Sequence, residues 1–179
     1  MDDLKTYAAW ERLGDGRPVL IRAIRPDDKE ALQNLVRRLS PESAYLRFFQ
    51  AKRELSPDEL HYYADVDFQS HVALVAVVQE EGSDLLIGTG RFFIGEEAVP
   101  GEAELSFLVD EAHQGLGMAT HLLRHLARIA RARGISGFRA GVIADNQKML
   151  DVFSHSGLPM EVVPAGGMTE VRLFLKDLI

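Results

Sequence analysis

The stretch FLVDEAHQGLGMATHLLRHLARIA, residues 107–130, passes from an apolar strand through a polar turn and a Gly-x-Gly pair into a long amphipathic helix. The N-terminus of a helix carries unpaired N–H groups and about half a positive charge. Glycines let the backbone close on a ligand without interference from a Cβ atom. Residues 114–120 are therefore predicted to form an anion site suited to phosphate or pyrophosphate. The plain alternative is a strand–turn–helix connection that needs glycine only for its φ angles.

Two common phosphate-binding loops are excluded by the spacing. No Gly-Lys-Ser/Thr follows the turn, so it is not a P-loop. Thr120 stands where a dinucleotide-binding fingerprint needs a third glycine or an alanine, and the acidic residue expected about 20 residues further on is missing.

The rest of the chain predicts alternating short helices and strands. Helices are expected to begin at Pro26, Ser40 and Ser56, and a capping box is expected between Ser56 and Glu59. The expected strands cover residues 19–25, 71–78, 85–93, 102–110, 138–143, 160–164 and 169–175, and a later helix is expected to be capped by Asp145 or Asn146. This order predicts an α+β (mixed α/β) fold with a mostly antiparallel twisted sheet flanked by helices, in a single domain over residues 1–179.

Composition limits the classes of function. The absence of cysteine excludes disulfides, thiolate metal sites and a cysteine nucleophile, and it fits a reducing compartment such as the cytoplasm. The net charge of −7 argues against nucleic-acid binding; it suits a cationic substrate or simply aids solubility. No signal peptide and no apolar run of about 20 residues is present, so no membrane association is expected.

The turn resembles a known cofactor loop. Gln114, Gly117 and Ala119 form the pattern Gln-x-x-Gly-x-Ala, which resembles the acyl-CoA pyrophosphate loop of the GNAT N-acetyltransferase superfamily. Downstream, ADNQKMLDVFSHSGL resembles the second signature of that superfamily, an Asn followed by a helix that ends in Gly-aromatic, with Asn146, Met149 and Gly157 at the matching positions. The resemblance covers residues 18–175, which is the expected core of the domain.

The front of the chain carries a narrower resemblance. The segments VLIRAIRPDDKEALQNLVRRLSPESAYLRFF, LSPDEL and DVDFQSHVALVAVV look like the acetyltransferase domain of bacterial protein-lysine acetyltransferases. Those enzymes often fuse this domain to a further module, for which 179 residues leave no room. A stand-alone domain with different regulation is therefore expected.

The resemblance implies acetyl-CoA as cosubstrate and no metal. The residues expected at the cofactor are Leu108 and Val109, the turn residues Gln114, Gly115, Leu116, Gly117, Met118, Ala119 and Thr120, and downstream Asn146 and Phe153. A backbone amide near Leu108 or Val109 is expected to stabilise the oxyanion. Asn146 could equally cap its helix. His121 and His125 have a spacing that can bind metal, but arginines share their face, so both are predicted to lie on a solvated surface.

Glu104 is the expected general base. An amine with a pKa of about 10.4, such as lysine, must lose a proton before it attacks a thioester. Ala103-Glu104 matches the Ala-Glu of the resembling lysine acetyltransferases; Glu102 on the same strand face is the rival, and a merely solvated carboxylate is the alternative. Phe153 stands where many superfamily members have a tyrosine as general acid.

Two consequences for the chemical steps follow from these residues. Either no general acid or a nearby hydroxyl, Ser154 or Ser156, is expected, because a thiol with a pKa of about 8.5 can leave unaided. The lack of cysteine excludes an acyl-cysteine relay and favours direct attack in a ternary complex.

The sequence thus predicts an acyl-CoA-dependent N-acetyltransferase, with a protein lysine as the leading amine acceptor. Tyr62 or Tyr63 could line the acceptor side. Two alternatives stay open: an N-acetyltransferase for a small molecule or amino acid, and an acyl-CoA-binding sensor without catalysis. A homodimer is compatible with the sequence.

Overall fold

The computed structural model describes residues 3–42, 54–96, 98–143 and 146–175. Its elements, in chain order, are η1 (Leu4–Thr6), β1 (Ala8–Arg12), β2 (Pro18–Ala23), η2 (Pro26–Asp28), α1 (Lys29–Arg38), α3 (Pro57–Ala64), β3 (His71–Glu80), β4 (Ser83–Phe93), β5 (Glu102–Val109), η3 (Glu111–His113), α4 (Met118–Ala132), β6 (Gly137–Ile143), α5 (Gln147–Ser154), β7 (Met160–Ala165) and β8 (Met168–Phe174). Most of the helix predicted from Ser40, and the alternative cap Asp145, lie outside the described residues.

In the described part of the chain, eight strands form one sheet in the order β1-β2-β3-β4-β5-β6-β8-β7. Every neighbouring pair is antiparallel except β5 and β6, which run parallel. The predicted α+β fold with a mostly antiparallel sheet flanked by helices is confirmed. Strand β1 was missed because its short run of alanines, AAWER, has little apolar alternation.

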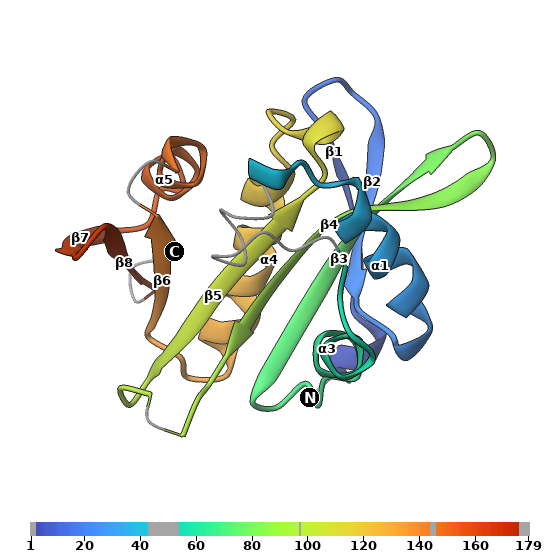
Figure 1. Ribbon diagram of the computed structural model, residues 1–179. Coiled ribbons are helices and arrows are strands. Elements are labelled where there is room, and N and C mark those ends of the chain that lie inside the picture. Colours follow the sequence, from blue (N-terminus) through green and yellow to red (C-terminus); the bar gives the residue numbers. More distant parts are fainter. Residues whose placement is uncertain (1–2, 43–53, 97, 144–145, 176–179) are drawn as a thin grey trace.

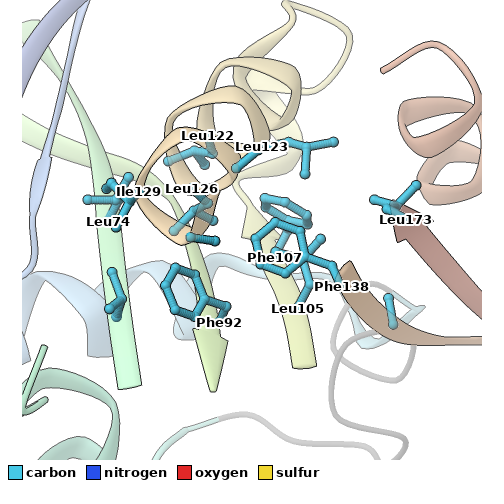
Figure 2. Packing of buried hydrophobic residues seen from close by; sticks show 14 of the residues in the cluster. Leu74, Phe92, Leu105, Phe107, Leu122, Leu123, Leu126, Ile129, Phe138 and Leu173 are labelled. Carbon is cyan, nitrogen blue, oxygen red and sulfur yellow. The ribbon is translucent and has the colours of Figure 1, made fainter. Parts of the chain in front are cut away.

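Helices cover both faces of the central strands (Figure 1). Along β3, Leu74 and Ala76 contribute to the core that contains the apolar side of α4, and Ala73 and Val75 contribute to a second core with α1 and α3. This accounts for the continuous apolar run in β3, since a strand covered on both faces needs no alternation. Figure 2 shows Leu122, Leu126 and Ile129 of α4 packed over the sheet.

Local sequence signals explain where several helices begin and end. Ser56 and Glu59 form the predicted capping box of α3, with hydrogen bonds of 3.2 and 3.0 Å in the two directions. Helix α4 ends before Gly134, whose φ of +82° is a left-handed conformation that favours glycine.

A buried ion pair fixes the start of α1. Arg22 of β2 donates two hydrogen bonds of 2.8 Å to the carboxylate of Asp28. The backbone amide of Arg25 donates a third, of 2.7 Å. Burial alone would raise the pKa of Asp28, but the hydrogen bonds from Arg22 and Arg25 outweigh it and lower that pKa.

The prediction that His121 and His125 lie on a solvated face is wrong for His125, which is 3% exposed. Strand β1 and Tyr7, the residue before it, lie against this side of α4 and supply the partners. His125 donates from Nε2 to Glu11 at 2.8 Å, and its Nδ1 shares a hydrogen bond with the hydroxyl of Tyr7. His121, which is partly exposed, donates to the carbonyl of Arg12 at 2.8 Å. The histidines therefore dock the N-terminal strand onto α4.

Within the residues that the structure describes, none of the helices combines the length and the apolar character that crossing a bilayer demands.

Candidate active site

The turn between β5 and α4 needs both of its glycines for their backbone conformation. Gly115 has a φ of +80° and Gly117 a φ of +81°, values that L-residues with a side chain rarely adopt. A Cβ atom added at either position would meet no atom within 4 Å, so each glycine borders open space. Gly117 is the N-cap of α4 and offers no side-chain cap to the helix.

Six consecutive amides, those of residues 115–120, have no acceptor within the turn or the helix that follows it. Within the described part of the chain, no residue accepts a hydrogen bond from the amides of Gly115, Leu116 or Gly117. The amides of residues 118–120 belong to the first turn of α4, where a helix has no acceptor of its own. That turn contains no acidic residue. The arrangement fits the predicted anion site, and it fits a diphosphate better than a single carboxylate because of its length.

The turn is held from two sides by segments far away in the sequence. The amide of Gly14, in the β1–β2 hairpin, donates to the carbonyl of Leu116 at 2.8 Å. On the other side, the amide of Ser40 donates to Glu111 at 2.6 Å, and Arg38 donates to Asp110 at 3.2 Å. These contacts keep the open amides in place before any ligand binds. They were missed because they join residues more than 70 positions apart, and a sequence carries no direct signal for such contacts.

One cation at the turn was also missed. Lys148, in the first turn of α5, donates from Nζ to the side-chain oxygen of Gln114 at 3.0 Å. This contact brings a positive charge to the edge of the open amides. The QKM segment after Asn146 could have signalled it, because a lysine in the helix that follows the second signature can reach back to the first.

Strands β5 and β6 are paired only at the end of β5 that lies away from the glycine turn. They are paired only from Glu102 to Glu104 on β5, opposite Gly137 to Arg139 on β6. Beyond Glu104, β5 continues to Val109 and, among the described strands, pairs with β4 alone. Among the residues that the structure describes, no strand therefore pairs with the β6-facing edge of β5 between Glu104 and the glycine turn, and Glu104 lies where the two strands part.

The ladder with β4 determines which amides face this open edge. The amide of Asp110 donates to the carbonyl of Ile87 at 2.8 Å, and the β4–β5 register is unbroken. Because hydrogen bonding alternates along an antiparallel ladder, Leu108 directs its amide towards β4. Phe107 and Val109 direct theirs towards the open edge.

The two candidate bases have different surroundings. Glu102 is 9% exposed and forms ion pairs with Arg172 and, at 3.5 Å, with Arg139. Glu104 is exposed, and its backbone neighbours across the sheet are Phe93 on β4 and Arg139 on β6. Glu102 is thus engaged in holding β5, β6 and β8 together, whereas Glu104 is accessible at the open edge.

The remaining predicted site residues divide between backbone and core roles. Asn146 caps α5 by accepting from the amide of Met149 at 3.3 Å. Met118 is 1% exposed and belongs to the core under α4. Phe153 is 1% exposed and packs against Phe107 with ring centroids 6.3 Å apart.

The two serines near Phe153 use their hydroxyls internally. Ser154 donates to the carbonyl of Asp151 at 3.1 Å, and Ser156 donates to the carbonyl of Phe153 at 2.7 Å.

On the sheet face that carries α1 and α3, a cluster of aromatic and basic side chains lies beside Glu104. Arg91 is buried and donates to the carbonyl of Tyr63 at 2.9 Å and to Nε2 of His71 at 3.1 Å. Burial, and after it the charge of Arg91, lower the pKa of His71 to about 4, so its imidazole is neutral at pH 7. Tyr62 and Phe93 complete the cluster.

In the described part of the chain, no group of three or more histidine, cysteine or acidic side chains is placed to hold a metal ion. The site that the structure does assemble consists of an open row of amides, an open strand edge and an exposed carboxylate at its far end. Such a site can hold an anionic, extended ligand along β5 and present its end to a base.

Known proteins resemble this chain in sequence and in fold. Residues 35–158 match the acetyltransferase (GNAT) family. An acetyltransferase of Pseudomonas aeruginosa is 36% identical over 142 residues, which are 79% of this chain and 75% of that protein. The acetyltransferase Pat of Mycolicibacterium smegmatis is 31% identical over 137 residues, 76% of this chain and 40% of that protein.

A solved structure agrees with these matches. The crystal structure of the GNAT domain of S. lividans PAT is 36% identical, covers 93% of this chain and 96% of its own, and superposes with a TM-score of 0.83. The predicted resemblance to such domains is confirmed, and the chain belongs to the acetyltransferase (GNAT) family.

Proposed function

We propose that this acetyltransferase transfers the acetyl group of acetyl-CoA to an amine, most favourably the side-chain amine of a protein lysine. The observation that carries the proposal is the open edge of β5, which runs from the free amides of the glycine turn to Glu104. Residues 115–120 would bind the diphosphate through their amides, and Lys148 would add a positive charge beside it. Acetyl-CoA supplies the activated acetyl thioester.

The amides of Phe107 and Val109 are the oxyanion donors in this proposal. Both face the open edge, whereas the ladder directs the amide of Leu108 towards β4. Preorganised donors of this kind typically contribute about 10²–10³ in kcat each. At about 3.3 Å per residue, Phe107 lies about 10 Å along the strand from Glu104, so the carboxylate would act through a water molecule.

Glu104 would take the proton of the attacking amine. Its exposure at the point where β5 and β6 part lets an acceptor approach from solvent. We propose that the thiolate leaves without a general acid, because Phe153 has no hydroxyl and the two nearby serines donate to backbone carbonyls. Asn146 can both cap α5 and touch the cofactor arm with its remaining polar atoms.

Protein lysine is preferred over the other acceptors because Glu104 is exposed on the sheet face rather than enclosed in a small pocket. We further infer that residues 1–179 act as one acetyltransferase domain. A cytoplasmic setting is supported by the absence of cysteine, and a homodimer stays a prediction.

The test uses radiolabelled acetyl-CoA with a panel of lysine peptides, small amines and amino acids. Glu104→Gln should lower kcat about 10²–10⁴-fold, the usual contribution of a general base. Glu102→Gln is the matched control on the same strand face; because its ion pairs hold strands together, it should lower stability but keep kcat of the folded protein within about fivefold. Equal activity of Glu104→Gln and the wild type would remove the base assignment. Binding of acetyl-CoA without transfer to any acceptor would instead favour the sensor.

A further inference from the structure

A row of side chains crosses three strands next to the proposed base. His71 on β3 pairs with Phe93 on β4, and Phe93 pairs with Glu104 on β5. Residues paired in this way point to the same face, with Cβ atoms about 4.5–5.5 Å apart. Phe93 is partly exposed and Glu104 is exposed, so an aromatic ring adjoins the carboxylate at the surface.

Helix α3 adds a second ring to this row. The ring of Tyr62 lies 6.5 Å from that of Phe93 in an edge-to-face arrangement, and 5.1 Å from the imidazole of His71. Tyr62 is nevertheless 50% exposed. We call Tyr62 and Phe93 the aromatic wall. It leads from solvent to Glu104 and presents apolar surface that the core does not use.

The aromatic wall is fixed in place by Arg91. The hydrogen bonds of Arg91 to Tyr63 and His71 join α3 to the sheet, and its guanidinium lies 4.9 Å from the centroid of the Tyr63 ring. Its charge therefore faces groups inside the cluster rather than solvent. Because Arg91 donates to Nε2 of His71, that nitrogen carries a lone pair, and the imidazole adds no positive charge beside the wall.

From this arrangement we propose that the aromatic wall binds the alkyl chain of the acceptor and makes the enzyme select amines carried on a long alkyl chain, as in lysine, over short amines. The inference rests on the proposed function. The methylenes of the acceptor pack on Phe93 and Tyr62 while the amine reaches Glu104. A protonated amine is attracted by the faces of both rings and by the carboxylate before it loses its proton.

The test measures binding, so it does not depend on knowing the natural acceptor. Two conjugates are used, in which the sulfur of coenzyme A is joined through an acetyl bridge either to Nε of lysine methylamide or to ethylamine. Each buried methylene contributes roughly fourfold in affinity, and the lysine side chain has two more carbons than ethylamine, so the lysine conjugate should bind the wild type about 15-fold more tightly than the ethylamine conjugate. Calorimetry gives both dissociation constants, and acetyl-CoA serves as the reference ligand.

Variants then locate the effect. Tyr62→Ala and Phe93→Ala should each reduce the preference to about threefold or less and leave the affinity for acetyl-CoA unchanged, whereas Tyr62→Phe should retain it. Trp10→Ala removes another exposed aromatic ring, on β1, and should change neither the preference for the lysine conjugate nor the affinity for acetyl-CoA. Far-ultraviolet circular dichroism checks that each variant is folded.

The outcomes separate this inference from the proposed function. If the wild type binds acetyl-CoA but shows no preference for the lysine conjugate, or if Tyr62→Ala and Phe93→Ala both keep the full preference, the aromatic wall has no role and the proposed function stands. If neither conjugate nor acetyl-CoA binds, both are overturned.

Discussion

The histidine that joins β1 to α4 offers a quantitative test of how the N-terminal strand is held. His125→Ala removes the hydrogen bond of 2.8 Å to Glu11 and the one shared with Tyr7. A hydrogen bond to a charged group contributes about 1.5–3 kcal/mol and a neutral one about 1 kcal/mol. Glu11 regains water because it is partly exposed, which argues for the lower half of that range. The expected loss in the free energy of unfolding is therefore about 2.5–3 kcal/mol.

Urea unfolding measures this loss directly. Trp10 is the only tryptophan and lies on β1 beside Glu11, so its fluorescence reports the docking of that strand, while circular dichroism reports the whole fold. Tyr7→Phe removes one hydroxyl and should cost about 1 kcal/mol in the wild type. In the His125→Ala background the same change should cost almost nothing, because its partner is gone.

The double-mutant cycle of Tyr7→Phe and His125→Ala measures whether the two side chains interact. If the Tyr7→Phe and His125→Ala effects are additive, the two side chains do not interact, and the network described for β1 is wrong. A total loss below about 1 kcal/mol for His125→Ala would show that this network does not hold the strand.

Three other predictions follow from named contacts. Asp28→Asn should lower the free energy of unfolding by about 3–5 kcal/mol, because it leaves the guanidinium of Arg22, whose side chain is only 14% exposed, without a charged partner. A loss under about 1 kcal/mol in urea would contradict this. His71 should titrate near pH 4 by NMR. Because that pKa lies below the usual value of 6.5, the folded state binds fewer protons than the unfolded state between these two pH values. The contribution of neutral His71 to stability is therefore present above pH 6.5 and lost as the pH falls towards 4. An NMR midpoint near 6.5 would refute the prediction. Lys148→Met should weaken acetyl-CoA binding about tenfold by calorimetry, whereas Lys29→Met, far from the turn in the sequence, should not, and an unchanged dissociation constant for Lys148→Met would remove its phosphate role.

Signals that are local in the sequence predicted local structure correctly. The capping box at Ser56 and the glycine after α4 are set by neighbours within a few residues, and both elements form as expected. The two left-handed glycines of the turn likewise follow from Gly115 and Gly117 themselves. The position of Glu104 on the face opposite α4 followed from the alternation of β5.

Features that depend on distant segments were missed for a physical reason. The exposed face assigned to His125 assumed that nothing covers the polar side of α4, but Glu11 and Tyr7, more than 100 residues away, lie against it. The point at which β5 and β6 stop pairing is also a property of the two strands together, because no residue in either strand alone marks it. The alternation of the β4–β5 ladder, which directs the Phe107 amide to the open edge, becomes visible only once the register is known.

The central claim is that the open amides of residues 115–120 bind the diphosphate of coenzyme A. Calorimetric titration of the wild type with acetyl-CoA and with S-acetylpantetheine, which has the same thioester arm but lacks the diphosphate and the adenosine 3′-phosphate attached to it, tests it most directly. The account predicts heat of binding with acetyl-CoA and an affinity at least about 100-fold weaker for S-acetylpantetheine, because charge-assisted hydrogen bonds to several amides would be lost. No heat with acetyl-CoA, or equal affinity for the two ligands, would contradict it.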